Sequence, residues 1–197
     1  MSAAADPDKS AIRAFVALDL HPMGVRRIGR VAERLRMSSG APSATWTPPT
    51  KIHVTLKFIG QLPTSTVEPL QKAIGLLIDG KAAPMVGEIG LDAFPSMREA
   101  LVVVATLSDP KGELAHWARR LDDRAALLGI ARETRAFRPH VTLARLKRAY
   151  DARRWLRPEL AGGAGECIAA TLTLYRSVVG LEVSAYEALA RFAFASS

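Results

Sequence analysis

Residues 51–60 read KIHVTLKFIG, and the pattern returns at residues 138–145 as RPHVTLAR. Both stretches are rich in β-branched and apolar residues and follow prolines, and a glycine ends the first, as is typical of β-strands. Because successive side chains of a strand point to opposite faces, His53 and Thr55 share one face of the first strand. The apolar side chains between them face the core. The stretch therefore offers an imidazole and a hydroxyl, about 7 Å apart, away from the core.

The second stretch repeats this arrangement with His140 and Thr142. Two such half-sites could enclose one ligand. Strict alternation also predicts that Lys57 lies on the face of the first histidine, whereas it places Arg145 on the face opposite His140.

The rest of the chain interleaves strand and helix patterns. Alternating or continuous apolar runs predict strands, and apolar spacing of three and four predicts helices. Residues 65–68 have the sequence of a capping box, which predicts the start of one helix. Asp109, before Pro110, is a predicted N-cap and marks the start of another. The predicted strands, besides the two motif strands, are 12–20, 85–94, 101–107, 168–179 and 186–194, and the predicted helices are 22–37, 65–79 and 110–128.

This order indicates an α+β domain. The two motif histidines are 140 − 53 = 87 residues apart, which suits one motif in each half of the chain. We therefore predict that residues 1–197 form a single domain of two similar lobes, with the motifs at 53–56 and 140–143.

The charge of the chain favours an anionic partner. Lys and Arg exceed Asp and Glu by 27 − 19 = +8, and the sequence pI is about 10.1. RNA or a nucleotide would be a suitable partner for this charge. The same charge is also compatible with a basic protein that has no polyanion partner. One cysteine excludes an intrachain disulfide. No apolar stretch has the length of a signal or membrane segment, so we predict a cytoplasmic protein that does not bind a membrane. No heptad pattern indicates an obligate protein partner, and we predict none.

Two histidines suit phosphodiester hydrolysis. The reaction needs a base that takes a proton from water and an acid that gives one to the leaving oxygen, and imidazoles exchange protons near neutral pH. The two threonine hydroxyls could bind the non-bridging oxygens, and Lys57 could stabilise the growing charge. A zinc site would need an adjacent carboxylate or cysteine in metal-binding spacing, which neither copy supplies. We therefore predict no metal and no cofactor.

The sequence resembles the 2H phosphoesterases, which carry two such His-x-Thr or His-x-Ser motifs. More narrowly, it is similar to the RNA 2′,3′-cyclic phosphodiesterases, historically called 2′-5′ RNA ligases. The resemblance covers nearly the whole chain. It rests on RAFVALDL at 13–20, TWTPPTKIHVTLKFIG at 45–60, AFPS at 93–96, FRPHVTLAR at 137–145 and YEALARF at 186–192.

The resemblance implies a bilobal fold in which two antiparallel sheets line a central cleft, with helices outside. It implies hydrolysis of RNA 2′,3′-cyclic phosphate ends to 2′-phosphomonoesters, with RNA ends or small cyclic nucleotides as partners. His53 would be the proton donor and His140 the proton acceptor. Substrate would be bound by Thr55, Thr142, Arg145, Lys57 and Phe15. The segment after AFPS lacks the proline and the further basic residues of the family pattern, which leaves the role of Arg98 open.

Two other functions fit the same residues. The reverse reaction would join a cyclic phosphate to a 5′-hydroxyl as a 2′-5′ link. A module that binds nucleotide or RNA without catalysis is the third reading, although both histidines and both threonines are present.

Overall fold

The computed structural model describes residues 10–162, 167–178 and 185–195. Its strands form two sheets, and every pairing between these strands is antiparallel. The first sheet contains β1 (Ala11–Leu20), β3 (His53–Pro63), β4 (Met85–Val86), β8 (Cys167–Val178) and β9 (Ala185–Ala193). The second contains β2 (Ala44–Trp46), β5 (Ile89–Phe94), β6 (Ala100–Leu107) and β7 (His140–Tyr150). The predicted α+β class with two antiparallel sheets is confirmed.

The strand order places one motif in each sheet. In the first sheet the order is β3-β1-β8, and β4 and β9 both pair with β8. In the second sheet the order is β2-β7-β6-β5. The first motif therefore begins β3 at one edge of its sheet, and the second motif begins β7, which lies between β2 and β6.

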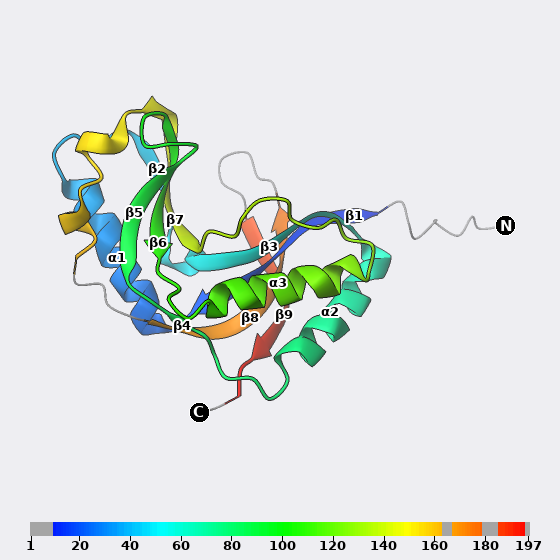
Figure 1. Cartoon of the computed structure of the whole chain (residues 1–197). Coiled ribbons are helices and arrows are strands. Elements are labelled where there is room, and N and C mark those ends of the chain that lie inside the picture. Colours follow the sequence, from blue (N-terminus) through cyan, green and yellow to red (C-terminus); the bar gives the residue numbers. More distant parts are fainter. Residues whose placement is uncertain (1–9, 163–166, 179–184, 196–197) are drawn as a thin grey trace.

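The three helices are α1 (Pro22–Met37), α2 (Thr64–Ile78) and α3 (Glu113–Ala126), and the short turns are η2 (Pro49–Lys51), η3 (Ala152–Arg154) and η4 (Pro158–Leu160). Helices α2 and α3 lie side by side against the first sheet, and α1 lies at the other side of the molecule (Figure 1). The face of α3 toward the sheet carries the predicted apolar stripe, of which Leu114, Trp117, Ala118, Leu121 and Ala125 are buried. In the described part of the chain, no helix is both long and apolar enough to cross a membrane.

The predicted helix starts were partly wrong. Helix α2 begins at Thr64, and no side chain caps it, so the sequence 65–68 does not act as a capping box. Helix α3 begins at Glu113 rather than at Pro110. Asp109 still stabilises this helix start, because its carboxylate accepts hydrogen bonds from the backbone N–H groups of Leu114 and Ala115.

The predicted strand 85–94 is two strands in different sheets. Its first part is β4 in one sheet, and its second part is β5 in the other. The chain crosses between the sheets at Gly87, whose N–H donates to the Ser108 carbonyl. A β-carbon at Gly87 would lie 2.7 Å from the backbone carbonyl oxygen of Ser108, so only glycine allows this close approach.

Candidate active site

Each motif strand contains a β-bulge directly after its threonine. The pairing of β3 with β1 passes from Thr55 to Lys57, so Leu56 is an extra residue. The pairing of β7 with β6 skips Leu143, the leucine of the second motif, in the same way. In a bulge, two residues of one strand face a single residue of its partner, and the alternation of side chains is broken. In both strands the leucine and the residue after it are buried, and the next residue is exposed.

The bulge in β3 turns Lys57 into the protein. Lys57 is 3% exposed, and its ammonium donates to Asp122 Oδ1 at 2.7 Å and to the Ala131 carbonyl at 2.8 Å. The prediction that Lys57 shares the face of His53 is therefore wrong, because strict alternation ends at the bulge. Phe58 takes that place: it is 62% exposed and lines the cleft described below.

The bulge in β7 has the opposite consequence for Arg145. Strict alternation predicts Arg145 on the face opposite His140, but the extra residue moves its side chain to the same face, where it lines the cleft. Phe58 and Arg145 thus occupy equivalent places, each five residues after its motif histidine (58 − 53 and 145 − 140).

A cleft of about 690 Å³ brings the two motifs together. It is lined by His53 and Thr55 from one sheet and by His140 and Thr142 from the other. Within the described residues, no Asp or Glu lines it, and no hydrogen bond occupies the hydroxyl of either threonine. The cleft also has a cationic and an aromatic lining, made by Arg13, Lys51, Arg145 and Lys147 and by Phe15, Trp46, Phe58 and Tyr186. Such a lining suits an anion that carries a flat ring.

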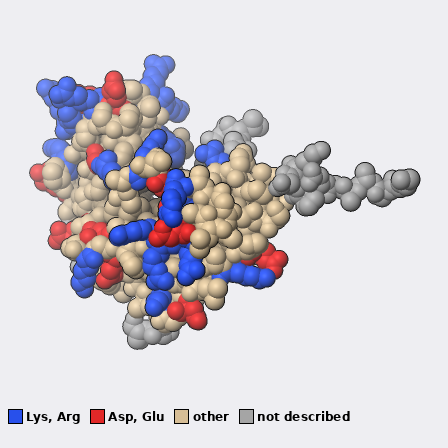
Figure 2. All heavy atoms as spheres, turned by 45° about the vertical axis from the view of Figure 1, so that its right-hand side comes forward, with Lys and Arg blue, Asp and Glu red and all other residues tan. Residues whose placement is uncertain are grey.

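Positive charge also gathers at one end of the surface. On the face shown in Figure 2, Lys and Arg side chains gather at the upper end of the molecule, where η3 and the turn between β5 and β6 lie in Figure 1. Arg98 is exposed in that turn and does not line the cleft.

Main-chain carbonyls orient both imidazoles. Nδ1 of His53 lies 2.9 Å from the Lys51 carbonyl oxygen, and Nδ1 of His140 lies 2.7 Å from the Arg138 carbonyl oxygen. A carbonyl only accepts, so Nδ1 carries a hydrogen in both rings. Nε2 is therefore left to take a proton when the ring is neutral and to give one when the ring is charged.

Aromatic rings surround His53. Phe15 stacks on it with centroids 5.2 Å apart, and Tyr186 meets it edge-on at 5.5 Å. Burial lowers the pKa of His53 below 6.5, while its hydrogen bond to the Lys51 carbonyl and the charge of Asp19 act in the opposite direction. Phe15 is itself only 5% exposed, and its ring also contacts those of Tyr175 and Tyr186.

The surroundings of His140 are different. Phe94 meets its ring edge-on at 5.1 Å, and the Arg138 guanidinium lies 5.0 Å from the centroid of Phe94. Arg138 also forms an ion pair with Asp92 at 2.6 Å. The two half-sites thus share their backbone geometry but differ in what lies behind each imidazole.

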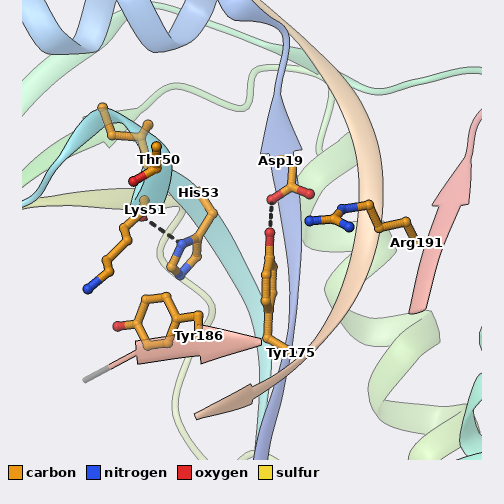
Figure 3. A pocket seen from close by; sticks show the side chains of 8 residues that line it. Asp19, Thr50, Lys51, His53, Tyr175, Tyr186 and Arg191 are labelled. Carbon is orange, nitrogen blue, oxygen red and sulfur yellow. Dashed lines mark hydrogen bonds between the residues drawn. The ribbon is translucent and has the colours of Figure 1, made fainter. Parts of the chain in front are cut away.

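A second cavity of about 190 Å³ lies beside His53 (Figure 3). Its lining includes Asp19, Tyr175 and Arg191, none of which the sequence interpretation assigned to the site. Alternation along β1 offered a signal for one of them, because Asp19 falls on the same face as Phe15. Tyr175 and Arg191 come from β8 and β9, and nothing local in their sequence points to the motifs. No group of three His, Cys, Asp or Glu side chains suited to a metal ion occurs among the described residues.

Two stretches of the chain, 18–104 and 104–179, match the family model described as LigT like phosphoesterase. The first contains His53 and the second contains His140. An RNA 2′,3′-cyclic phosphodiesterase of Aeropyrum pernix is 35% identical over 127 residues, which are 62% of this chain and 69% of that protein. One of Geobacillus stearothermophilus is 27% identical over 132 residues, which are 66% of this chain but only 41% of that longer protein.

Solved structures show the same fold. The crystal structure of Escherichia coli LigT complexed with 3′-AMP superposes with a TM-score of 0.77 at 22% identity, over 95% of this chain and all (100%) of that chain. This agreement confirms the predicted bilobal arrangement of two antiparallel sheets. The family model covers more than half of the chain, which confirms the resemblance to the 2H phosphoesterases: the protein belongs to the LigT-like phosphoesterase family.

Proposed function

We propose that this protein hydrolyses 2′,3′-cyclic phosphate ends of RNA to 2′-phosphomonoesters without a metal ion. The observation that carries the proposal is the pair of imidazoles in one cleft, each held at Nδ1 by the carbonyl two residues before it. The names of the relatives from Aeropyrum and Geobacillus support the choice of substrate. The complex of Escherichia coli LigT with 3′-AMP supports a nucleotide in the cleft.

In the proposed reaction, Nε2 of neutral His140 takes a proton from water as the oxygen attacks phosphorus. The bond from phosphorus to the ribose 3′ oxygen breaks, and the His53 imidazolium gives its Nε2 proton to that oxygen. The products are a 2′-phosphate and a 3′-hydroxyl. After the reaction His140 carries a proton and His53 has lost one. Exchange with solvent then removes the proton from His140 and restores one to His53.

The remaining residues stabilise the phosphate. The hydroxyls of Thr55 and Thr142 donate to the non-bridging oxygens, whose charge grows as water adds. Arg145 supplies a positive charge from the second half-site. Phe58, at the equivalent place in the first half-site, offers an apolar surface beside the histidine. No carboxylate of the described residues lines the cleft, so no lining carboxylate repels an anionic substrate or competes with it for these groups.

The test uses adenosine 2′,3′-cyclic phosphate in EDTA, with separation of 2′-AMP from 3′-AMP by chromatography. We expect 2′-AMP as the product, and we expect His53→Ala and His140→Ala each to lower kcat/KM at least about hundredfold. His116→Ala is the matched control, because His116 is an exposed histidine on α3.

Three results would overturn the proposal in different ways. Activity of either variant within about threefold of wild type, about 0.7 kcal/mol of barrier, would remove the acid and base assignment. Joining of a labelled 5′-hydroxyl RNA to the cyclic phosphate, faster than hydrolysis, would show a ligase. Binding of AMP without turnover of any cyclic phosphate would show a binding module.

A further inference from the structure

The end of β1 brings a carboxylate beside His53. Asp19 is the register partner of His53 in β3 and of Thr171 in β8. Side chains of residues that face each other across antiparallel strands lie on the same side of the sheet. Asp19 and His53 accordingly line the same small cavity, with Tyr175 beside them (Figure 3).

Three hydroxyl groups hold this carboxylate. Its Oδ1 accepts from the Tyr175 hydroxyl at 2.7 Å, and its Oδ2 accepts from Thr173 at 2.6 Å and from Thr171 at 2.9 Å. Hydroxyl donors match an ionised carboxylate, which can only accept, and they bring no positive charge. Within the described residues, no Lys or Arg forms an ion pair with Asp19. Its carboxylate is therefore fixed in place by hydroxyl groups, and the guanidinium of Arg191 points toward it from β9 in the same cavity without forming an ion pair (Figure 3).

The two imidazoles differ in the carboxylates that lie near them. The titratable groups around His53 are Asp19 of β1, Lys51 of η2, Tyr175 of β8, Tyr186 and Arg191 of β9, and His140 across the cleft. Among the described residues that line the two cavities, Asp19 is the only carboxylate. On the side of His140, Asp92 is already paired with Arg138. A carboxylate without an ion pair thus lies beside the imidazole that must be charged, whereas the carboxylate on the side of the imidazole that must be neutral is paired.

We propose that Asp19 is a positioning residue that favours the protonated, proton-donating form of His53. This inference rests on the acid role of His53 in the proposed function. The carboxylate acts through space, because Nδ1 of His53 is already bonded to the Lys51 carbonyl. A nearby negative charge stabilises an imidazolium and so opposes the effect of burial on this ring.

The first experiment needs no turnover. The protonation of His53 and His140 is followed by NMR in protein with labelled histidine, for wild type, Asp19→Asn and Asp19→Ser. We expect the His53 midpoint to fall by about half a pH unit or more in both variants, and the His140 midpoint to change much less. Asp79→Asn, an exposed aspartate after α2, removes the same charge at a distance and is expected to leave both midpoints unchanged.

The second experiment varies the leaving group. On adenosine 2′,3′-cyclic phosphate, Asp19→Asn is expected to lower kcat about tenfold and to move the alkaline fall of activity to lower pH. On 3′-deoxyadenosine 2′-(4-nitrophenyl phosphate), the same variant is expected to stay within about twofold of wild type, because nitrophenolate leaves without a proton. A variant that only disturbed packing would lose activity on both substrates.

The results separate this inference from the proposed function. An unchanged His53 midpoint in both charge-removing variants, or equal losses on the two substrates, would overturn the role of Asp19. A wild-type protein that does not hydrolyse cyclic phosphates would overturn the proposed function, while the titration would still show whether Asp19 acts on His53.

Discussion

Lys57 lies inside the protein at a junction of three segments. It extends from β3, and its ammonium is bonded to Asp122 of α3 and to the carbonyl of Ala131, in the segment that leads to the second motif. Its side chain is 2% exposed and that of Asp122 is 17% exposed. Replacing Lys57 with Met would keep most of the apolar stem and remove the charge and both hydrogen bonds.

The expected loss of unfolding free energy depends on how Asp122 is left after Lys57 is replaced. Removing one partner of a buried ion pair costs about 3–5 kcal/mol. Asp122 keeps some contact with solvent and a second partner, Arg132, at 3.2 Å, so we expect a smaller loss than this range, about 2–3 kcal/mol. For a chain of 197 residues, each kcal/mol lowers Tm by about 2–4 °C. The Lys57→Met variant should therefore melt about 4–12 °C below wild type.

The assay is thermal and urea unfolding, together with kcat/KM at a temperature at which both proteins are folded. We expect a clear loss of stability and a change in kcat/KM of less than about threefold, because the ammonium faces away from the cleft. Lys72→Met is the matched control: this lysine pairs with Glu68 on the surface of α2, with both side chains more than 70% exposed, and the substitution should leave Tm nearly unchanged because solvent screens the pair. A Lys57→Met protein of wild-type stability, or one that is stable but loses activity more than tenfold, would refute the reasoning.

Three further predictions concern the cleft and the core. Phe58→Ala should leave Tm nearly unchanged, because the ring is 62% exposed, but raise the Kd for AMP about tenfold in calorimetry if the ring stacks on the base; unchanged binding would argue against stacking. Burial lowers the pKa of His53 below 6.5, so the unfolded chain binds more protons between these two pKa values, and stability is lost as pH falls through this window. His53→Gln should therefore lose less unfolding free energy than wild type between pH 7 and pH 5 in urea titrations, and equal losses would contradict this. Trp155→Phe removes an indole N–H that donates to the Leu35 carbonyl and to Ser38 Oγ, and should cost about 1–3 kcal/mol in the same titrations.

The fold class could be predicted from the sequence, and so could the meeting of the two motifs in one site. Periodicity identified the strands and helices because apolar faces must be buried whatever the details of the loops. The bulges could not be predicted in this way. Leu56 and Leu143 are apolar and buried, so they satisfy the strand pattern with or without a bulge, and only the partner strand shows that one residue is extra.

The residues behind His53 were missed for a different reason. Tyr175 reaches the site from β8, and Tyr186 reaches it from β9. These strands follow the second motif in the chain, yet they belong to the sheet of the first motif. Their contribution depends on strand order, which is set by the whole sheet and not by a local pattern. Alternation along β1 could have placed Asp19 on the face of the site. Its role, however, depends on the three hydroxyls that hold its carboxylate, and these are evident only in the structure.

The hydrogen-bond acceptors of the two imidazoles belong to the backbone, and this bears on how freely the chain can diverge. The Lys51 and Arg138 carbonyls hold the rings, and a carbonyl is present whatever side chain stands at these positions. Substitution at 51 or 138 therefore keeps the backbone acceptor that holds each ring at Nδ1, as long as the local backbone is kept. Mutant libraries aimed at new phosphoester substrates can vary position 51, which lines the cleft, whereas Arg138 is kept because it pairs with Asp92 and packs over Phe94, the ring that contacts His140.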